Sequence, residues 1–241
     1  FTGNVTVSSQ GTSGNVTIDN GTTALGVQGT ANGNLVLISG EVITDSAALT
    51  VSGTTTVTTD VADKAITLGT LASTGDVSLN SSGTTGNAVV NNTTTALGLA
   101  ASSIGGTLTA ETDNSITVKG TVTSKGVTSL SASDDVIFAA AGALASTNGN
   151  ITVTADDDNT PTGTGGAMTM ANGATINSGT GTITLSADED IALGGLTTTN
   201  ATGAAVSITS DNGSITDAGE TSVDITASTT GAVVTLVAKN A

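Results

Sequence analysis

The stretch Leu185-Ser-Ala-Asp-Glu-Asp-Ile191-Ala-Leu193 contains, in order, the end of a short alternating strand, an acidic corner and a second short strand. Two further stretches have the same order: Leu108-Thr-Ala-Glu-Thr-Asp-Asn-Ser-Ile116-Thr-Val118 and Leu130-Ser-Ala-Ser-Asp-Asp-Val136-Ile-Phe138. Self-similarity at a spacing of this size is typical of solenoids, in which each copy forms one structural unit that stacks on the next.

The first half of the chain uses similar pieces. Three of them begin with a Gly-Asn pair: Gly3-Asn4-Val5-Thr6-Val7, Gly14-Asn15-Val16-Thr17-Ile18 and Gly33-Asn34-Leu35-Val36-Leu37. Across the chain, Val, Ile or Leu alternates with Thr or Ser over three to five residues, which is the period-two pattern of a half-buried strand. Strands this short suit a stacked coil better than a sandwich of longer strands.

The spacing of the copies predicts the coil length. The interval from Leu108 to Leu130 is nearly the same as the intervals from Leu130 to Val153 and from Leu185 to Ile208. Together they indicate a solenoid with a period of about 22 residues. The interval from Val153 to Leu185 is clearly wider, which indicates a coil with a surface insertion near residues 156–166.

We therefore expect an all-β fold, a right-handed parallel β-helix of about 11 coils with three short strands per coil. The array is expected to cover residues 1–241, with degenerate coils in 1–104 and clearer repeats in 105–241. Neighbouring coils are needed because a single coil cannot bury its apolar surface alone.

Composition supports a narrow core. Hydrophobic residues make up 37% of the 241 residues but aromatic residues only 1%, so the interior has to be filled by small branched side chains. Abundant Thr and Val favour strands over helices, and their presence argues against disorder. Phe138 is expected to fill the lumen of the coil, and Phe1 to plug its end.

Charge narrows the choice of partners. The formal net charge is −16, with 20 acidic residues against four lysines. Nucleic acid and anionic membrane surfaces are not expected as partners, because Lys and Arg supply the affinity for both. No run of 18 apolar residues is present, so no membrane insertion is expected.

The residues needed for most catalysis are missing. Without His or Cys the chain has no imidazole general base, nucleophilic thiol or zinc-site ligand set, and we expect no enzyme, no catalytic residue and no bound cofactor. A polysaccharide-active β-helix enzyme that works with carboxylates alone is the remote alternative.

The acidic corners are the one place where a metal is considered. Clustered carboxylate oxygens are the ligands that Ca²⁺ prefers, and the weak candidates are Asp156, Asp157, Asp158 and Asn159. The preferred interpretation is that the acidic corners, which include Asp134-Asp135 and Asp188-Glu189-Asp190, are solvated and keep rods apart.

The pattern of strand, Ser/Ala-Asp-Asp corner, Asp-Ile-x-Leu strand and Thr-rich strand resembles the repeat region of filamentous haemagglutinin-type proteins. It is also similar to β-strand-repeat adhesins of bacterial surfaces. The segments that carry the resemblance are 108–122, 130–144 and 185–196. It implies a right-handed β-helical rod, secretion across the outer membrane, and a role as a stalk or adhesin.

Both ends of the sequence have strand patterns, and the chain begins with Phe1 and not with Met. We expect a processed or excised segment whose partners are further copies, end to end, or the rest of a longer solenoid. The expected function is a structural component of a secreted filament or cell-surface stalk. The alternative is an adhesin that binds host cells, neighbouring cells or surfaces, for which 156–166 is the clearest candidate segment.

Overall fold

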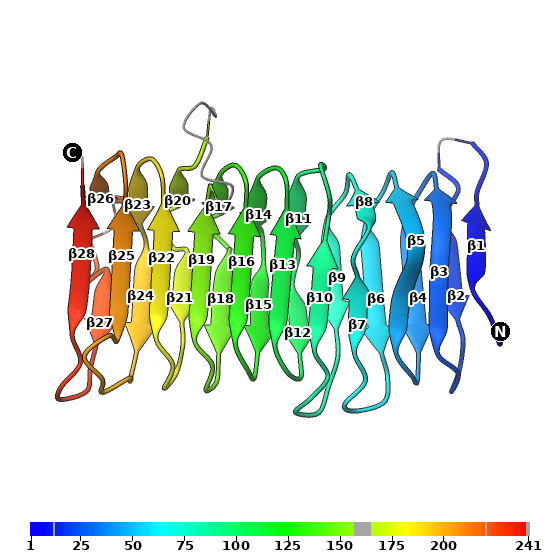
Figure 1. Cartoon of the computed structure of the whole chain (residues 1–241), viewed down its shortest axis with the longest axis horizontal. Coiled ribbons are helices and arrows are strands. Elements are labelled where there is room, and N and C mark those ends of the chain that lie inside the picture. The colour runs from blue at the N-terminus through cyan, green and yellow to red at the C-terminus, as the bar shows by residue number, and fades with distance from the viewer. Residues whose placement is uncertain (12, 157–164, 220, 240–241) are drawn as a thin grey trace.

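The computed structural model describes residues 1–11, 13–156, 165–219 and 221–239, which form short strands joined by tight corners. In these residues no helix is long and apolar enough to cross a membrane. Every strand pair is parallel, and the strands form two sheets that run the length of the molecule (Figure 1).

One sheet, here called sheet A, has 12 strands. They are β1 (Val5–Ser8), β3 (Leu25–Ala31), β5 (Ile43–Val51), β7 (Ile66–Leu68), β8 (Leu71–Ser73), β10 (Ala88–Asn91), β13 (Leu108–Thr112), β16 (Thr128–Ala132), β19 (Ile151–Ala155), β22 (Ile183–Ala187), β25 (Val206–Ser210) and β28 (Val234–Ala238).

The second sheet, sheet B, has 16 strands. They are β2 (Val16–Asp19), β4 (Leu35–Ser39), β6 (Thr55–Thr59), β9 (Val77–Asn80), β11 (Leu97–Leu99), β12 (Ser102–Ile104), β14 (Ile116–Val118), β15 (Thr121–Ser124), β17 (Val136–Phe138), β18 (Ala143–Ser146), β20 (Met168–Met170), β21 (Thr175–Asn177), β23 (Ile191–Leu193), β24 (Gly195–Thr198), β26 (Ile215–Asp217) and β27 (Ile225–Ala227).

The chain alternates between the sheets, which makes it a β-solenoid. In Figure 1 the chain rises along the near sheet, crosses at the top and descends along the far sheet. With each turn it advances from the N-terminus on the right toward the left, so the coil is right-handed. The all-β, parallel, coiled architecture confirms the predicted fold. The path of sheet A contains eleven strands, from β1 to β28. The coil therefore makes slightly fewer complete turns between the two ends of this sheet than the expected 11.

The expectation of three strands in every coil is wrong for the first coils. Each turn has a straight side made of one strand and a bent side. In the first coils the bent side is one long strand, β3 or β5, and from β7 and β8 onward it is a pair of short strands, such as β14 and β15. The long strands β3 and β5 pair with an irregular register between Val27 and Gly29, where the chain bends.

Straight strands show why the sequence alternates. In β4, Leu35, Leu37 and Ser39 are buried, whereas Val36 and Ile38 are partly exposed. Because parallel coils stack in register about 4.8 Å apart, each inward side chain lies on its equivalent in the next coil. The core is therefore a set of ladders of Leu, Ile, Val and Ala.

The strand register tests the predicted intervals. Leu130 pairs with Val153, Val153 with Leu185 and Leu185 with Ile208, so these three intervals, including the wide one, are confirmed. The predicted interval from Leu108 to Leu130 was wrong. Leu108 pairs with Thr128, and a two-residue shift between similar sequences produced the error, because alternation repeats every two residues.

The two phenylalanines behave differently. Phe138 is fully buried in the core, as expected. Phe1 is 70% exposed and does not plug the end of the rod. Its backbone, and not its ring, is held, because Oδ1 of Asn20 accepts a hydrogen bond from the Phe1 amino group at 2.5 Å.

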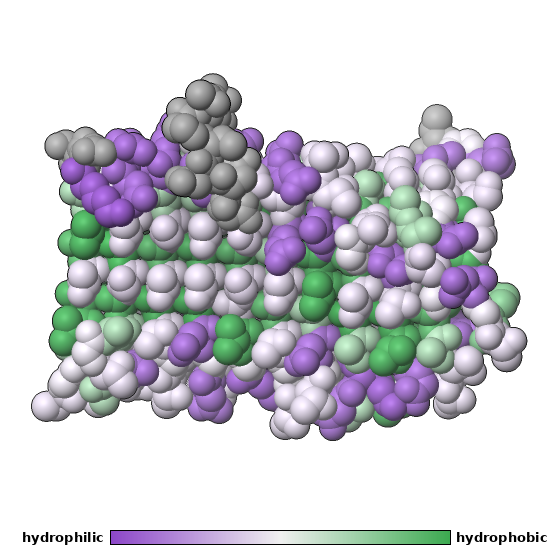
Figure 2. Space-filling model, viewed as in Figure 1, coloured by the Kyte–Doolittle hydropathy of each residue, from purple (hydrophilic) through white to green (hydrophobic). Residues whose placement is uncertain are grey.

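The outward side chains of sheet A form a regular surface. Figure 2 shows rows of pale side chains across the left half of the near face, over β13 to β28. The first row consists of the second residue of each straight strand, and successive members pair in register: Thr109, Ser129, Thr152, Thr184, Ser207 and Thr235. This face is hydroxyl-rich and contains no charge in that row.

Candidate functional site

The corners of the coil hold most of the polar side chains, and one position in them recurs. The residue just before a straight strand accepts a hydrogen bond from the backbone of the next coil. Oδ1 of Asn15 accepts from the amide of Asn34 at 2.8 Å, and Oδ1 of Asn34 accepts from the amide of Thr54 at 3.0 Å. Oδ1 of Asn87 and Asn150 do the same for Thr107 and Thr182.

Two acidic corners use the same geometry on the bent side. Oδ1 of Asp135 accepts from the amide of Ala167 at 3.0 Å, and Oδ1 of Asp190 accepts from the amide of Ser214 at 2.7 Å. Bonds to a charged acceptor are stronger than neutral ones. These aspartates were expected only to be solvated, but they also connect one coil to the next.

Glycines lie beneath these side chains. A Cβ at Gly53 would collide with Oδ1 of Asn34 and with the backbone of Gly33. The same corner stacks directly on its neighbours, because the amide of Gly53 donates to the carbonyl of Gly33 and that of Gly75 donates to the carbonyl of Gly53, both at 3.1 Å. Close backbone approach is therefore what requires glycine here.

Of the predicted calcium ligands, Asp157, Asp158 and Asn159 lie outside the described residues. Asp156 has a left-handed backbone (φ 60°), and its amide donates to the carbonyl of Asp134 at 3.2 Å. Within the described ranges no group of three or more His, Cys, Asp or Glu side chains is placed to hold a metal ion.

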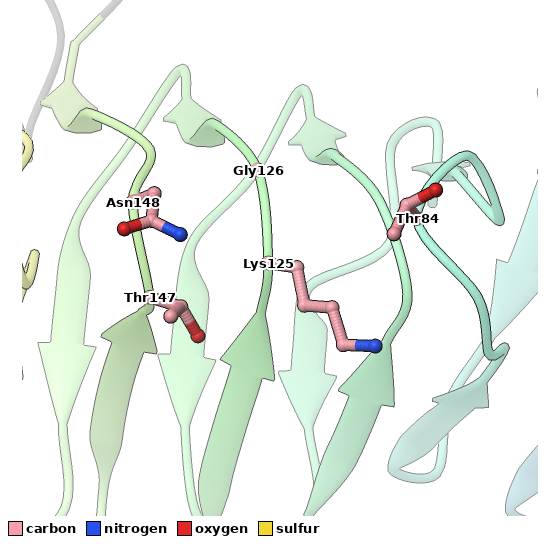
Figure 3. A pocket seen from close by; sticks show the side chains of 5 residues that line it. All are labelled: Thr84, Lys125, Gly126, Thr147 and Asn148. Atoms are coloured by element: carbon pink, nitrogen blue, oxygen red, sulfur yellow. The ribbon is translucent and has the colours of Figure 1, made fainter.

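A shallow pocket of about 280 Å³ lies on the corner opposite the acidic one. It is lined by Thr84, Lys125, Gly126, Thr147 and Asn148, and Figure 3 shows Lys125 between Thr84 on one side and Thr147 and Asn148 on the other. Nζ of Lys125 donates to the carbonyl of Gly83 at 2.8 Å, so the one cation in the pocket fastens a corner. The lining offers hydroxyl and amide groups without an acid–base pair.

Asp63, beside this corner, holds the chain in a tight turn. Its Oδ1 accepts from the amides of Thr84 and Thr85 at 2.6 and 2.8 Å. These bonds, that from Thr84 first, lower the pKa of the Asp63 carboxyl below its usual 3.8. Stabilisation of the charged form by backbone donors is the physical cause.

The lysines form ion pairs or hydrogen bonds with other coils, so they do not form a basic patch. Lys64 pairs with Glu41 at 2.8 Å, Lys119 with Asp76 at 2.5 Å and Lys239 with Asp211 at 2.7 Å. Each pair is partly exposed, so it contributes little to stability. Together with Lys125, all four lysines of the chain are engaged within the protein.

Sequence reasoning placed Gly and Asn at the corners of the coil but did not predict that the Asn side chains of the recurring Gly-Asn pairs join neighbouring coils. The signal was available, since a Gly-Asn pair stands directly before the strand at residues 14, 33, 86 and 149. Their role depends on the stacking of the coils, because each Asn bonds to a residue 19–32 positions later in the chain.

The fold and the corners together define a β-solenoid repeat protein whose polar side chains mainly join neighbouring coils. The chain belongs to the family described as repeats of unknown function (DUF5649), which matches residues 13–83 and 85–147. No match was found among curated proteins. None was found among solved structures either.

Proposed function

We propose that this chain is a structural segment of an extracellular filament or cell-surface stalk of a bacterium, in a protein of the filamentous haemagglutinin-like kind, without catalysis. The observation that carries the proposal is the unbroken parallel pairing that connects β1 to β28. Such a stack resists bending and extension because every coil is hydrogen-bonded to the next.

The distribution of side chains supports a passive rod. Most of the described inward positions hold aliphatic residues that pack on the next coil, and the corner carboxamides and carboxylates bind its backbone. The net charge of −16 keeps such rods soluble and apart. A segment built this way supplies length and stiffness.

The outermost strands of the described stack are open to a further coil, supplied by another copy, end to end, or by the rest of a longer solenoid. Val234 and Leu236 of β28 are 39% and 48% exposed, although their partners Val206 and Ile208 in β25 are buried. These side chains point along the core ladders and lack only a covering coil. An unpaired strand edge beside exposed apolar side chains favours the addition of another strand.

Electron microscopy of the chain over a range of concentrations, with and without chelator, tests the proposal. We expect fibres with an axial repeat of ~4.8 Å. Leu236→Asp should abolish elongation, because it places a charge on the core ladder. Val127→Asp, a matched exposed position outside the core of the stack, should not. Rods of about 50 Å that never elongate would contradict self-assembly, and loss of fibres on chelation would assign a role to Ca²⁺.

An adhesin is the second candidate, and one observation favours it. Asn150 and Thr182, which are hydrogen-bonded between consecutive coils, lie 32 residues apart, whereas the equivalent Asn87 and Thr107 lie 20 residues apart. Most of the extra residues fall at the acidic corner between β19 and β20. Additional length at one corner of a regular scaffold is a common place for binding residues, and here its ligand would belong to a host cell, a neighbouring cell or a surface.

A further inference from the structure

Two segments of the chain are copies of each other. Residues 5–27 and 77–99 are identical at 12 of 23 positions. The structure repeats with the sequence: Val5 pairs with Val27 and Val77 pairs with Leu99, and the equivalent glycines Gly11 and Gly83 have φ angles of 81° and 89°.

In each copy, two consecutive straight strands are separated by little more than half the usual number of residues. The short interval separates Asn4 from Asn15, which precede β1 and β2, and it separates Asp76 from Asn87, which precede β9 and β10. Straight strands that are stacked in one sheet are farther apart; Asn15 and Asn34, for example, precede β2 and β4 and lie 19 residues apart. The short interval therefore covers half a coil.

Half a coil moves the straight side to the opposite sheet. The straight strands β2, β4, β6 and β9 lie in sheet B, but the straight strands from β10 to β28 lie in sheet A. At the change, the straight strand β9 is followed in sheet B by the bent pair β11 and β12, because Val77 pairs with Leu99 and Asn80 with Ser103. In sheet A the short bent strand β7 is followed by the straight strand β10.

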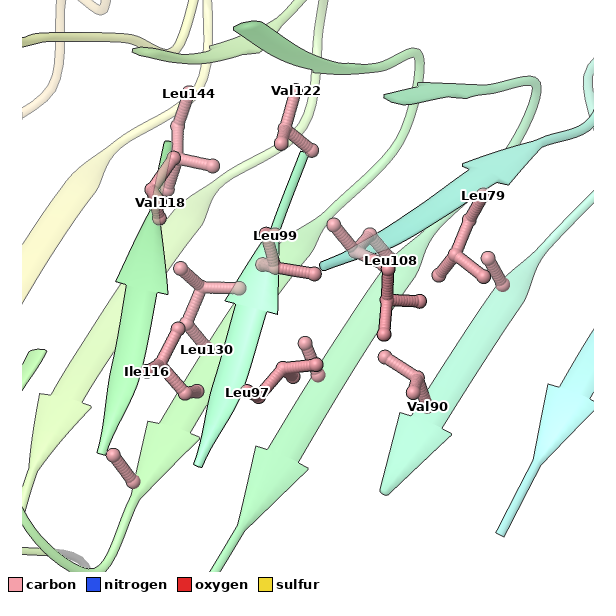
Figure 4. Close-up of a cluster of buried hydrophobic side chains, with 14 of the residues drawn as sticks. Leu79, Val90, Leu97, Leu99, Leu108, Ile116, Val118, Val122, Leu130 and Leu144 are labelled. Atoms are coloured by element: carbon pink, nitrogen blue, oxygen red, sulfur yellow. The ribbon is translucent and has the colours of Figure 1, made fainter. Parts of the chain in front are cut away.

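The core continues through the change. Figure 4 shows Leu79 of β9, Val90 of β10 and Leu97 and Leu99 of β11 among the buried side chains of this region, and all four are buried. The reversal therefore leaves the hydrophobic ladder intact.

The reversal leaves β8 with a strand partner on one side alone, since its only pairing is with β5. The buried Asn92 side chain covers the other side. Its Oδ1 accepts from the amide of Ser73 at 2.8 Å, and its Nδ2 donates to the carbonyl of Ser73 at 2.9 Å. The carboxamide thus pairs with Ser73 as a strand residue would.

The first copy has the same cap. Asn20, the equivalent of Asn92, bonds in the same way to Phe1, the equivalent of Ser73, through its amino group and carbonyl at 2.5 and 3.3 Å. Residue 93 shares the left-handed backbone of Gly21, with φ of 49° against 56°. Two independent copies of sequence, pairing and cap show that the half coil is a defined element.

We infer that residues 77–99 form a half-turn junction that reverses the straight and bent sides of the rod, with Asn92 as its cap. The family matches support this division, since 13–83 and 85–147 meet at residue 84, between β9 and β10. Successive units of this family that carry the junction therefore display their straight faces on opposite sides of one rod.

Paired nitroxide labels test the inference, and because the chain has no cysteine the labels are specific. Two residue pairs each lie on one face with their strands two coils apart, at an axial separation of ~10 Å: Thr17 with Thr56, and Thr109 with Thr152. Both cysteine pairs should give strong dipolar broadening. Thr56→Cys with Thr109→Cys should give none, because the labels point away from opposite sheets.

Deletion of residues 77–87 should bring Thr56 and Thr109 onto one face two coils apart, and the broadening of that pair should then match the other two. The other two pairs are the matched control, because their faces do not change. Broadening between Thr56 and Thr109 in the intact chain would overturn the inference. So would its absence in a deletion variant whose control pairs stay broadened. If the deletion variant does not fold, the intact chain alone decides.

Discussion

Asn92 illustrates what a single polar side chain does in this fold. It is fully buried and bonds to the carbonyls of Thr95 and Ala96 as well as to both backbone groups of Ser73. A buried polar group is tolerated when every bond is made, and it then specifies one arrangement. Here the specified arrangement is the edge of the half-turn junction.

Replacing Asn92 with alanine is expected to lower the free energy of unfolding by about 2–4 kcal/mol, because the amide and carbonyl of Ser73 would lose their partners inside the protein. Chemical denaturation measures the change, and faster hydrogen exchange at the Ser73 amide locates it. Asn148→Ala, at an exposed corner, is the control and should change stability by less than about 0.5 kcal/mol. Similar losses in both variants would contradict the role of Asn92.

Asp63 makes one corner sensitive to acid. Its folded-state pKa is lowered by the amides of Thr84 and Thr85, so its stabilising effect is present at pH values above the ordinary value of 3.8 and is lost as the pH falls through the folded-state pKa. We expect hydrogen exchange of the Thr84 amide to accelerate in that acidic range. In Asp63→Asn, which keeps an oxygen acceptor but does not titrate, the acceleration should disappear. An unchanged pH profile in the variant would assign the effect to other carboxyls.

At the scale of elements, the straight strands could be predicted from the sequence and the bent sides could not. A five-residue strand such as Leu35–Ser39 shows two full periods of alternation, which identifies both the strand and its buried face. From β7 onward the bent side consists of strands of three or four residues, such as Ile116–Val118 and Thr121–Ser124, whose pattern is too short to distinguish one strand from two. Which strands form straight sides and which form bent sides is decided by how whole coils pair with one another, and a short sequence pattern does not contain this information.

The corners were the least predictable elements. Composition indicated turns, but the partner of each Asn or Asp lies in the next coil, for example 20 residues away between Asn34 and Thr54. Acidic corners were assigned to solvent because charge alone was considered. The glycines that lie beneath side chains such as Asn15 and Asn34 carried the missing information, since they show that a neighbouring group approaches closely.

Gly53→Ala is expected to destabilise the stack by about 1–3 kcal/mol, because its Cβ would overlap the Asn34 side chain and the Gly33 backbone. Gly203→Ala is the matched control, since no atom lies within 4 Å of the added Cβ. Thermal unfolding of both variants measures the difference. A Gly53→Ala variant as stable as the control would show that the corner accommodates the added Cβ without loss of stability.

At the scale of the whole molecule, the straight faces are flat and nearly free of charge although the chain carries −16. Most carboxylates lie at corners, where they face solvent or bind the next coil. A rod of this kind repels its neighbours along its edges and leaves its flat faces neutral. The half-turn junction places such faces on two sides of one rod, an arrangement that no composition or period count reveals.

The bonds made by the Asn and Asp residues that directly precede a strand run in one direction. Their side-chain oxygens accept from a residue that comes later in the chain, as Asn15 does from Asn34 and Asp190 from Ser214. A finished coil therefore presents its acceptor before the donor has been synthesised. Because each coil depends on its nearest neighbours, a chain that emerges N-terminus first finds a ready template for every new coil, and the molecule can grow in the same direction in which it is delivered.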